Sequence, residues 1–91
     1  MTYTFYADPG HAWLEVTLTD VLAVGLQPKQ FSQYSYKDIG RSVTKLYLEE
    51  DCDAGIFIGA WEAKNPGQAF PMKEKHSNSE SFVRRLSSIR A

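Results

Sequence analysis

The sequence has a single cysteine, two histidines and no long apolar run. With Cys52 as its only thiol the chain forms no internal disulfide, which excludes the disulfide-stabilised scaffolds of small secreted proteins. No apolar stretch approaches the roughly 20 residues that a helix needs to cross a bilayer. Met1–Gly10 lacks the basic region and apolar run of a signal peptide. We therefore expect a cytoplasmic protein with no membrane partner.

Aromatic side chains, in contrast, are abundant. They make up 13% of the 91 residues, while the hydrophobic fraction of 43% and the charged fraction of 23% are ordinary for a globular protein. This length is enough for one domain, residues 1–91, and too short for two. The aromatic rings give such a small domain large side chains to bury.

The net charge of −1 conceals an uneven distribution. Residues 1–69 carry nine acidic and five basic side chains, whereas residues 70–91 carry two acidic and five basic ones. A basic tail on an acidic body suits an anionic partner or the acidic face of a second copy. A solvated, arginine-rich last segment explains the same pattern. Five positive charges do not favour direct nucleic-acid binding.

The first third of the chain predicts a hairpin and a short helix. Thr2–Ala7 and His11–Val16 are rich in β-branched and aromatic residues, and Asp8-Pro9-Gly10 between them is a strong turn signal. Thr17 is placed to cap a helix of about two turns that ends at Gly25.

The remaining elements are expected at these positions: a strand at 34–37, a turn at 38–41, a strand at 42–48, a helix at 55–64, an edge strand at 70–76 and a terminal helix at 81–89. The order β-β-α-β-β-α-β-α predicts an α+β fold. We expect a small antiparallel sheet, built from two hairpins plus an edge strand, packed against two or three helices.

The densest cluster of ionisable groups directly precedes the main helix. In it Asp51 is the expected N-cap, and Asp53 complements the positive end of the helix dipole. Cys52 between them is expected to be a small buried residue. Glu49 and Glu50 have no such structural role, which makes them the first candidates for a binding function.

Four motifs extend along nearly the whole chain: Asp8-Pro9-Gly10-His11 followed by Trp13, Tyr34-Ser35-Tyr36, the run Tyr47–Ala54, and His76 with Ser81 and an arginine-containing tail. Together they resemble an uncharacterised family of small single-domain proteins found on bacteriophages and plasmids. The eight-residue run is the most specific part, while the region around Gly40 and the tail match less well. The resemblance implies a mobile genetic element as the genetic context and no particular activity.

Two kinds of chemistry can be weighed against the sequence. Cys52 with His11 or His76 supplies the residue types of a hydrolase, but the acidic neighbours of the cysteine disfavour a thiolate. No H-x-x-x-H or C-x-x-C spacing points to a metal. We predict no catalytic residue, no metal and no cofactor.

The sequence favours a non-catalytic binding protein of a mobile genetic element. Its expected partner is a host protein, such as one of a defence system, which it would inhibit through an acidic and aromatic surface. The predicted binding residues are His11, Trp13, Tyr36, Glu49, Glu50, Asp53, His76 and Arg84.

Two alternatives stay open. In the first, His11, Trp13, Tyr36 and Arg84 enclose a small anionic, nucleotide-like ligand, or the chain is a minor hydrolase that uses His11, Cys52 and His76. In the second, the chain forms a homodimer through the helix face that carries two glycines, Gly55 and Gly59, where another backbone can approach closely.

Overall fold

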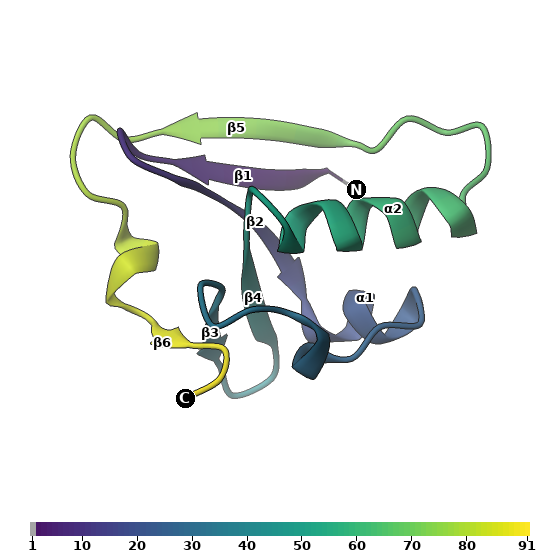
Figure 1. Cartoon of the computed structure of the whole chain (residues 1–91), viewed down its shortest axis with the longest axis horizontal. Coiled ribbons are helices and arrows are strands. Elements are labelled where there is room, and N and C mark those ends of the chain that lie inside the picture. Colours follow the sequence, from purple (N-terminus) through teal and green to yellow (C-terminus); the bar gives the residue numbers. More distant parts are fainter. Residues whose placement is uncertain (1) are drawn as a thin grey trace.

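A mixed β-sheet is the centre of the fold (Figure 1). The computed structural model describes residues 2–91, and within them six strands follow the order β5-β1-β2-β4-β3-β6. The strands are β1 (Tyr3–Ala7), β2 (Ala12–Thr17), β3 (Tyr36–Ile39), β4 (Thr44–Glu49), β5 (Met72–His76) and β6 (Ser87–Ser88). The helical elements are α1 (Leu18–Ala23), α2 (Asp53–Lys64) and two 3₁₀ turns, η1 (Pro28–Gln30) and η2 (Phe82–Arg85). The predicted α+β class is confirmed.

Local signals determine the first elements. β1 and β2 pair antiparallel on either side of the Asp8–Gly10 turn, with Tyr6 opposite Trp13. The Thr17 hydroxyl accepts a hydrogen bond from the backbone N–H of Asp20 at 3.0 Å and so caps α1. Gly25 follows the helix with a φ of +84°, a conformation that favours glycine.

One face of the sheet packs against α1 and α2, and we call it the helix face. Its core contains Leu14 of β2, Leu48 of β4, Val21 of α1 and Phe57 of α2, which are all fully buried. Phe57 also contacts the ring of Tyr3 edge-on, with 5.5 Å between centroids. This is the larger of the two cores.

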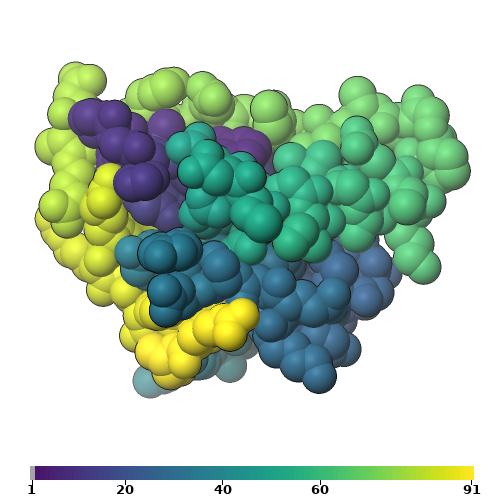
Figure 2. All heavy atoms as spheres, in the orientation of Figure 1, coloured from purple at the N-terminus to yellow at the C-terminus, as the bar shows by residue number. Residues whose placement is uncertain are grey.

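The opposite face is covered by the C-terminal residues 81–86, and we call it the tail face (Figure 1). Here Trp13 of β2 and Tyr47 of β4 form a second core with Val83, a residue of η2 that has no exposed surface. Since both faces are covered, Leu46, Tyr47 and Leu48 are buried in succession, although strand residues alternate between faces. Figure 2 shows the C-terminal residues in yellow lying against the blue segment around residue 33.

The predicted terminal helix at 81–89 is wrong. The Ser81 hydroxyl does cap a turn, accepting from the N–H of Val83, but η2 ends at Arg85 and the chain then extends into β6. β6 pairs with β3, and the N–H of Ile89 donates to the carbonyl of Ser35 at 2.8 Å. These long-range contacts outweigh the local helix signal, because a segment this short has little helical stability of its own.

The prediction of a purely antiparallel sheet is also wrong. β5 forms an edge of the sheet but pairs parallel to β1, with Phe5 opposite Glu74. All five residues of β5 are exposed. The parallel orientation follows from the connection, because β5 is reached from β4 through α2 and a long loop rather than through a tight turn (Figure 1).

The second pair of strands lies later in the sequence than predicted. β3 covers residues 36–39 rather than 34–37, and the turn to β4 is closed by a hydrogen bond from the N–H of Gly40 to the carbonyl of Val43 at 3.0 Å. A Cβ on Gly40 would lie 2.6 Å from that carbonyl oxygen, so the turn requires glycine.

Among residues 2–91 neither helix has the length and apolar character required to cross a membrane.

The start of α2 differs from the prediction at three residues. The N-cap is Cys52 rather than Asp51, and the Cys52 side chain is exposed rather than buried. Asp53 is 1% exposed, so it does not belong to a binding surface. Its carboxylate accepts hydrogen bonds from the backbone N–H and hydroxyl of Ser32, both at 2.8 Å, and from the Ser35 hydroxyl at 2.5 Å.

Asp53 therefore joins α2 to the loop before β3, and its loss should cost stability. We expect Asp53→Ala to lower the free energy of unfolding by about 3 kcal/mol, because it leaves buried donors without their charged acceptor. The exposed neighbour Asp51 provides the control, because Asp51→Ala should change the free energy of unfolding by less than about 0.5 kcal/mol. Urea denaturation measures both values, and equal stability of the two variants would contradict this role.

Candidate functional site

One carboxylate attaches the C-terminal segment to the sheet. The Asp8 side chain, in the turn between β1 and β2, is only 1% exposed. It accepts hydrogen bonds from the backbone N–H groups of Gly10 and His11, each at 3.0 Å, and from that of Ser81, also at 3.0 Å. Arg84 adds a bidentate pair, with Nε 2.7 Å from Oδ2 and Nη2 3.0 Å from Oδ1. Five donors thus converge on Asp8.

This environment keeps Asp8 ionised. The hydrogen bonds from Arg84 and then from the N–H of Ser81 hold the pKa of the Asp8 carboxyl far below its usual range, against the opposing effect of burial. The same contact raises the pKa of the Arg84 guanidinium. The positive charge of Arg84 is therefore matched by a permanent negative charge beside it.

The ion pair also fixes the position of Arg84 relative to the sheet. Its guanidinium carbon lies 5.3 Å from the centre of the Trp13 ring, within the range of a cation–π interaction. A Cβ on Gly10 would come within 2.9 Å of Nη2. The absence of a side chain at Gly10 gives the guanidinium room beside the turn.

Beside Arg84 the tail face is hollowed. This acidic–aromatic hollow has a volume of about 400 Å³ and seven lining residues: His11, Trp13, Tyr34, Tyr36, Glu49, Asp51 and Arg84. They come from the β1–β2 turn, β2, the loop before β3, β3, the end of β4, the following turn and η2. Because the strands and the C-terminal segment must all be in place to form it, the hollow is a product of the tertiary fold.

The aromatic part of the hollow is rigid at its base and open at its rim. Trp13 is 3% exposed, and its ring contacts those of His11 and Tyr36, with centroids 5.9 Å and 6.0 Å away. Tyr34, in contrast, is 65% exposed. The lining therefore combines a buried ring with an exposed ring that a ligand can cover.

The acidic part contains Glu49 and Asp51. The Glu49 carboxylate accepts hydrogen bonds from the backbone N–H groups of Asp51, at 2.9 Å, and Cys52, at 3.1 Å. Glu49 thus has the structural role at the start of α2 that the sequence assigned to Asp51. The Asp51 side chain is exposed and accepts no hydrogen bond from any residue within 2–91.

The charges of the hollow do not cancel. Arg84 is the only Lys or Arg side chain among the lining residues, and Asp8 already neutralises it at 2.7 Å. Glu49 and Asp51 therefore give the hollow a negative potential. This arrangement attracts a cationic group and repels an anionic one.

The structure brings together five of the eight predicted binding residues: His11, Trp13, Tyr36, Glu49 and Arg84. The other three lie elsewhere. Glu50 is exposed outside the lining, Asp53 is buried at the start of α2, and His76 lies at the end of β5 with Nε2 2.9 Å from a Glu74 oxygen.

Sequence reasoning missed three residues of this region. The sequence pattern assigns Asp51 to the helix cap, and Asp8 to its turn alone. Tyr34 was placed within a strand, although it precedes β3 and is open to solvent. The turn Asp8-Pro9-Gly10 signals a local role for the aspartate, but nothing in the sequence indicates its partner 76 residues away.

Within residues 2–91, no hydrogen bond joins the residues of the hydrolase alternative. His11 contacts Trp13, His76 contacts Glu74, and no hydrogen bond within residues 2–91 joins either histidine to Cys52. In the same described part of the chain, no three His, Cys, Asp or Glu side chains are grouped so that they could hold a metal ion.

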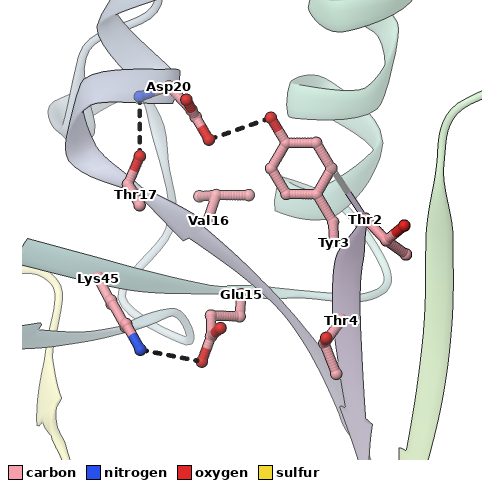
Figure 3. A pocket seen from close by; sticks show the side chains of 8 residues that line it. All are labelled: Thr2, Tyr3, Thr4, Glu15, Val16, Thr17, Asp20 and Lys45. Carbon is pink, nitrogen blue, oxygen red and sulfur yellow. Dashed lines mark hydrogen bonds and ion pairs between the residues drawn. The ribbon is translucent and has the colours of Figure 1, made fainter.

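Figure 3 shows a second hollow, where β1 begins and β2 ends. Its volume is about 60 Å³, space for only about two water molecules. Its ionisable groups are already paired: Tyr3 donates to Asp20 at 3.1 Å, and Lys45 lies 4.0 Å from Glu15. Burial, and then the charge of Asp20, raises the pKa of Tyr3 to about 12. This hollow is a well-satisfied part of the fold.

Comparisons with known proteins found no matching family model, no matching curated protein and no matching solved structure.

The Asp8–Arg84 pair predicts a specific pH dependence. A carboxyl whose pKa is lowered on folding stabilises the fold above its unfolded value of about 3.9, and this contribution is lost as the pH falls further. We expect Asp8→Asn to lower the free energy of unfolding by about 2 kcal/mol at pH 7. The difference from the unmodified chain should shrink below about pH 4.

Denaturant unfolding at about pH 7 and pH 3 measures the free energies of unfolding. The control is Glu62→Gln, at an exposed position of α2, which should change the free energy of unfolding by less than about 0.5 kcal/mol at both pH values. If Asp8→Asn loses as much stability at the lower pH as at the higher one, the ionised Asp8 carboxylate does not have this stabilising role.

Proposed function

We propose that this chain is a non-catalytic binding protein that recognises a protein partner through the acidic–aromatic hollow. The observation that carries the proposal is the convergence of Glu49 and Asp51 with Trp13, Tyr34 and Tyr36 around one concave surface. Aromatic side chains are enriched at the centres of protein interfaces, where a few residues supply most of the binding energy.

The construction of the hollow supports this proposal. Burial holds Trp13 in place and the bidentate pair with Asp8 holds Arg84, so these two side chains are positioned before any partner arrives. Binding to an ordered surface avoids part of the entropy cost of association. Tyr34 and Asp51 differ from them, since both side chains are exposed and available for a partner to cover.

The resemblance to bacteriophage and plasmid proteins suggests where the partner is found. We propose that the chain belongs to a mobile genetic element and that its partner is a host protein, such as a component of a defence system. Its acidic hollow would occupy a basic surface of that protein and so inhibit it, through complementary potentials.

A small-molecule site is the second candidate, because the four residues expected to enclose a nucleotide-like ligand do line one hollow: His11, Trp13, Tyr36 and Arg84. The charges argue against an anionic ligand. Both Nε and Nη2 of Arg84 are bonded to Asp8, and two carboxylates face the same space. The geometry therefore supports a protein partner better than a nucleotide.

A homodimer stays a prediction. Gly55 and Gly59 lie exposed on α2, and a Cβ at either position would meet no heavy atom within 4 Å. This surface is separate from the lining residues of the hollow.

The role of the hollow can be tested by affinity capture from a bacterial host extract. We expect the double variant Glu49→Gln/Asp51→Asn to lose at least about tenfold of the captured partner, since it removes the negative potential while keeping the side-chain shapes. The control Glu62→Gln/Glu74→Gln makes the same change in net charge at exposed positions outside the hollow and should retain the partner. Equal capture by both variants would overturn the proposal.

A further inference from the structure

We infer that the acidic–aromatic hollow receives a single arginine side chain of the partner protein. This inference rests on the proposed function and names the chemical group that the hollow recognises. It follows from the flat rings, the uncompensated carboxylates and the size of the space.

The aromatic rings favour a flat cation. A guanidinium group is planar and weakly hydrated, so it stacks on an aromatic face at a smaller desolvation cost than an ammonium group. Tyr34 and Tyr36 contribute rings to the lining, and Tyr34 is exposed. An arginine that enters the hollow can cover the Tyr34 ring and remove it from water.

The carboxylates supply the matching acceptors. Each oxygen of Glu49 accepts one backbone hydrogen bond, which leaves a lone pair on each for a further donor. Asp51 accepts no hydrogen bond from the described residues, so both of its oxygens have capacity for a guest. The five N–H donors of a guanidinium can pair with carboxylates in a bidentate manner, whereas a lysine ammonium acts as a point charge.

The protein already holds one guanidinium in this way. Arg84 lies over Trp13 at 5.3 Å and forms a bidentate pair with Asp8. The neighbouring set of Tyr34, Glu49 and Asp51 offers the same two elements, a ring and a carboxylate, to a second guanidinium. Repulsion from Arg84 is weak because Asp8 neutralises it.

The volume suits one side chain. At about 400 Å³ the hollow is at the lower end of the range for ligand pockets, which is roughly 300–1,000 Å³. A nucleotide would also fit this volume, so the negative charge of the hollow, and not its size, favours an arginine over a nucleotide. The partner's backbone would remain outside, against the rim.

The test titrates the ¹⁵N-labelled full chain with four probes: N-acetyl-arginine amide, N-acetyl-lysine amide, N-acetyl-citrulline amide and AMP. Citrulline has the shape of arginine without its charge. We expect the arginine probe to shift the Trp13 indole N–H signal with a Kd on the order of 1–10 mM. Trp61, which packs on the helix face, provides the internal control signal and should not move.

Three comparisons establish specificity. The lysine and citrulline probes should bind at least about fivefold more weakly than the arginine probe, and AMP should not shift Trp13. In Glu49→Gln/Asp51→Asn the arginine affinity should fall at least about tenfold, while Glu62→Gln/Glu74→Gln should keep it. Amide signals far from the hollow report whether each variant retains its fold.

The inference is overturned if citrulline binds as tightly as arginine, if AMP shifts Trp13 instead, or if no probe does so at about 50 mM. These results are distinct from failure of the proposed function. If the hollow binds a protein through another group, Glu49→Gln/Asp51→Asn still loses the captured partner, although the arginine probe does not shift the Trp13 signal. If the hollow is not an interface, this double variant captures as much partner as the unmodified chain.

Discussion

The hydrogen-bonded carboxylate of Asp8 is the contact on which the tail face depends. It joins the β1–β2 turn to Ser81 and Arg84, which follow more than 70 residues later in the chain. Once the segment is attached, Val83 is buried against Trp13 and Tyr47. Burial of an apolar side chain such as that of Val83 contributes about 2 kcal/mol, which is similar to the contribution of a hydrogen bond to a charged group. The ion pair and the apolar burial therefore hold the segment against the sheet together.

Acidic residues in this protein have two kinds of role, and the local sequence does not distinguish them. Asp53 and Glu49 both accept backbone hydrogen bonds near the start of α2, so each has a structural function. Glu49 also faces the hollow, together with Asp51. The functional proposal therefore depends on carboxylate oxygens that the fold leaves without a protein donor. This distinction is available only from the three-dimensional contacts.

Those parts of the fold that depend on neighbouring residues were predictable. The turn at Asp8–Gly10, the cap at Thr17 and the left-handed Gly25 all follow from short-range rules. The terminal segment and the parallel β5 were not, because both depend on pairing with strands distant in sequence. For the site, residue types indicated five members of the hollow, but Asp51 and Tyr34 required knowledge of which side chains face solvent.

The most direct test of the role of Asp8 is an NMR measurement of contacts between the Val83 methyl groups and the rings of Trp13 and Tyr47. In the unmodified chain these nuclear Overhauser effects should be strong, since the three residues form one buried cluster. In Asp8→Asn they should weaken or vanish, while the contact between Tyr3 and Phe57 on the helix face persists. If the Val83 contacts are equally strong in Asp8→Asn, the ion pair does not hold the segment in place.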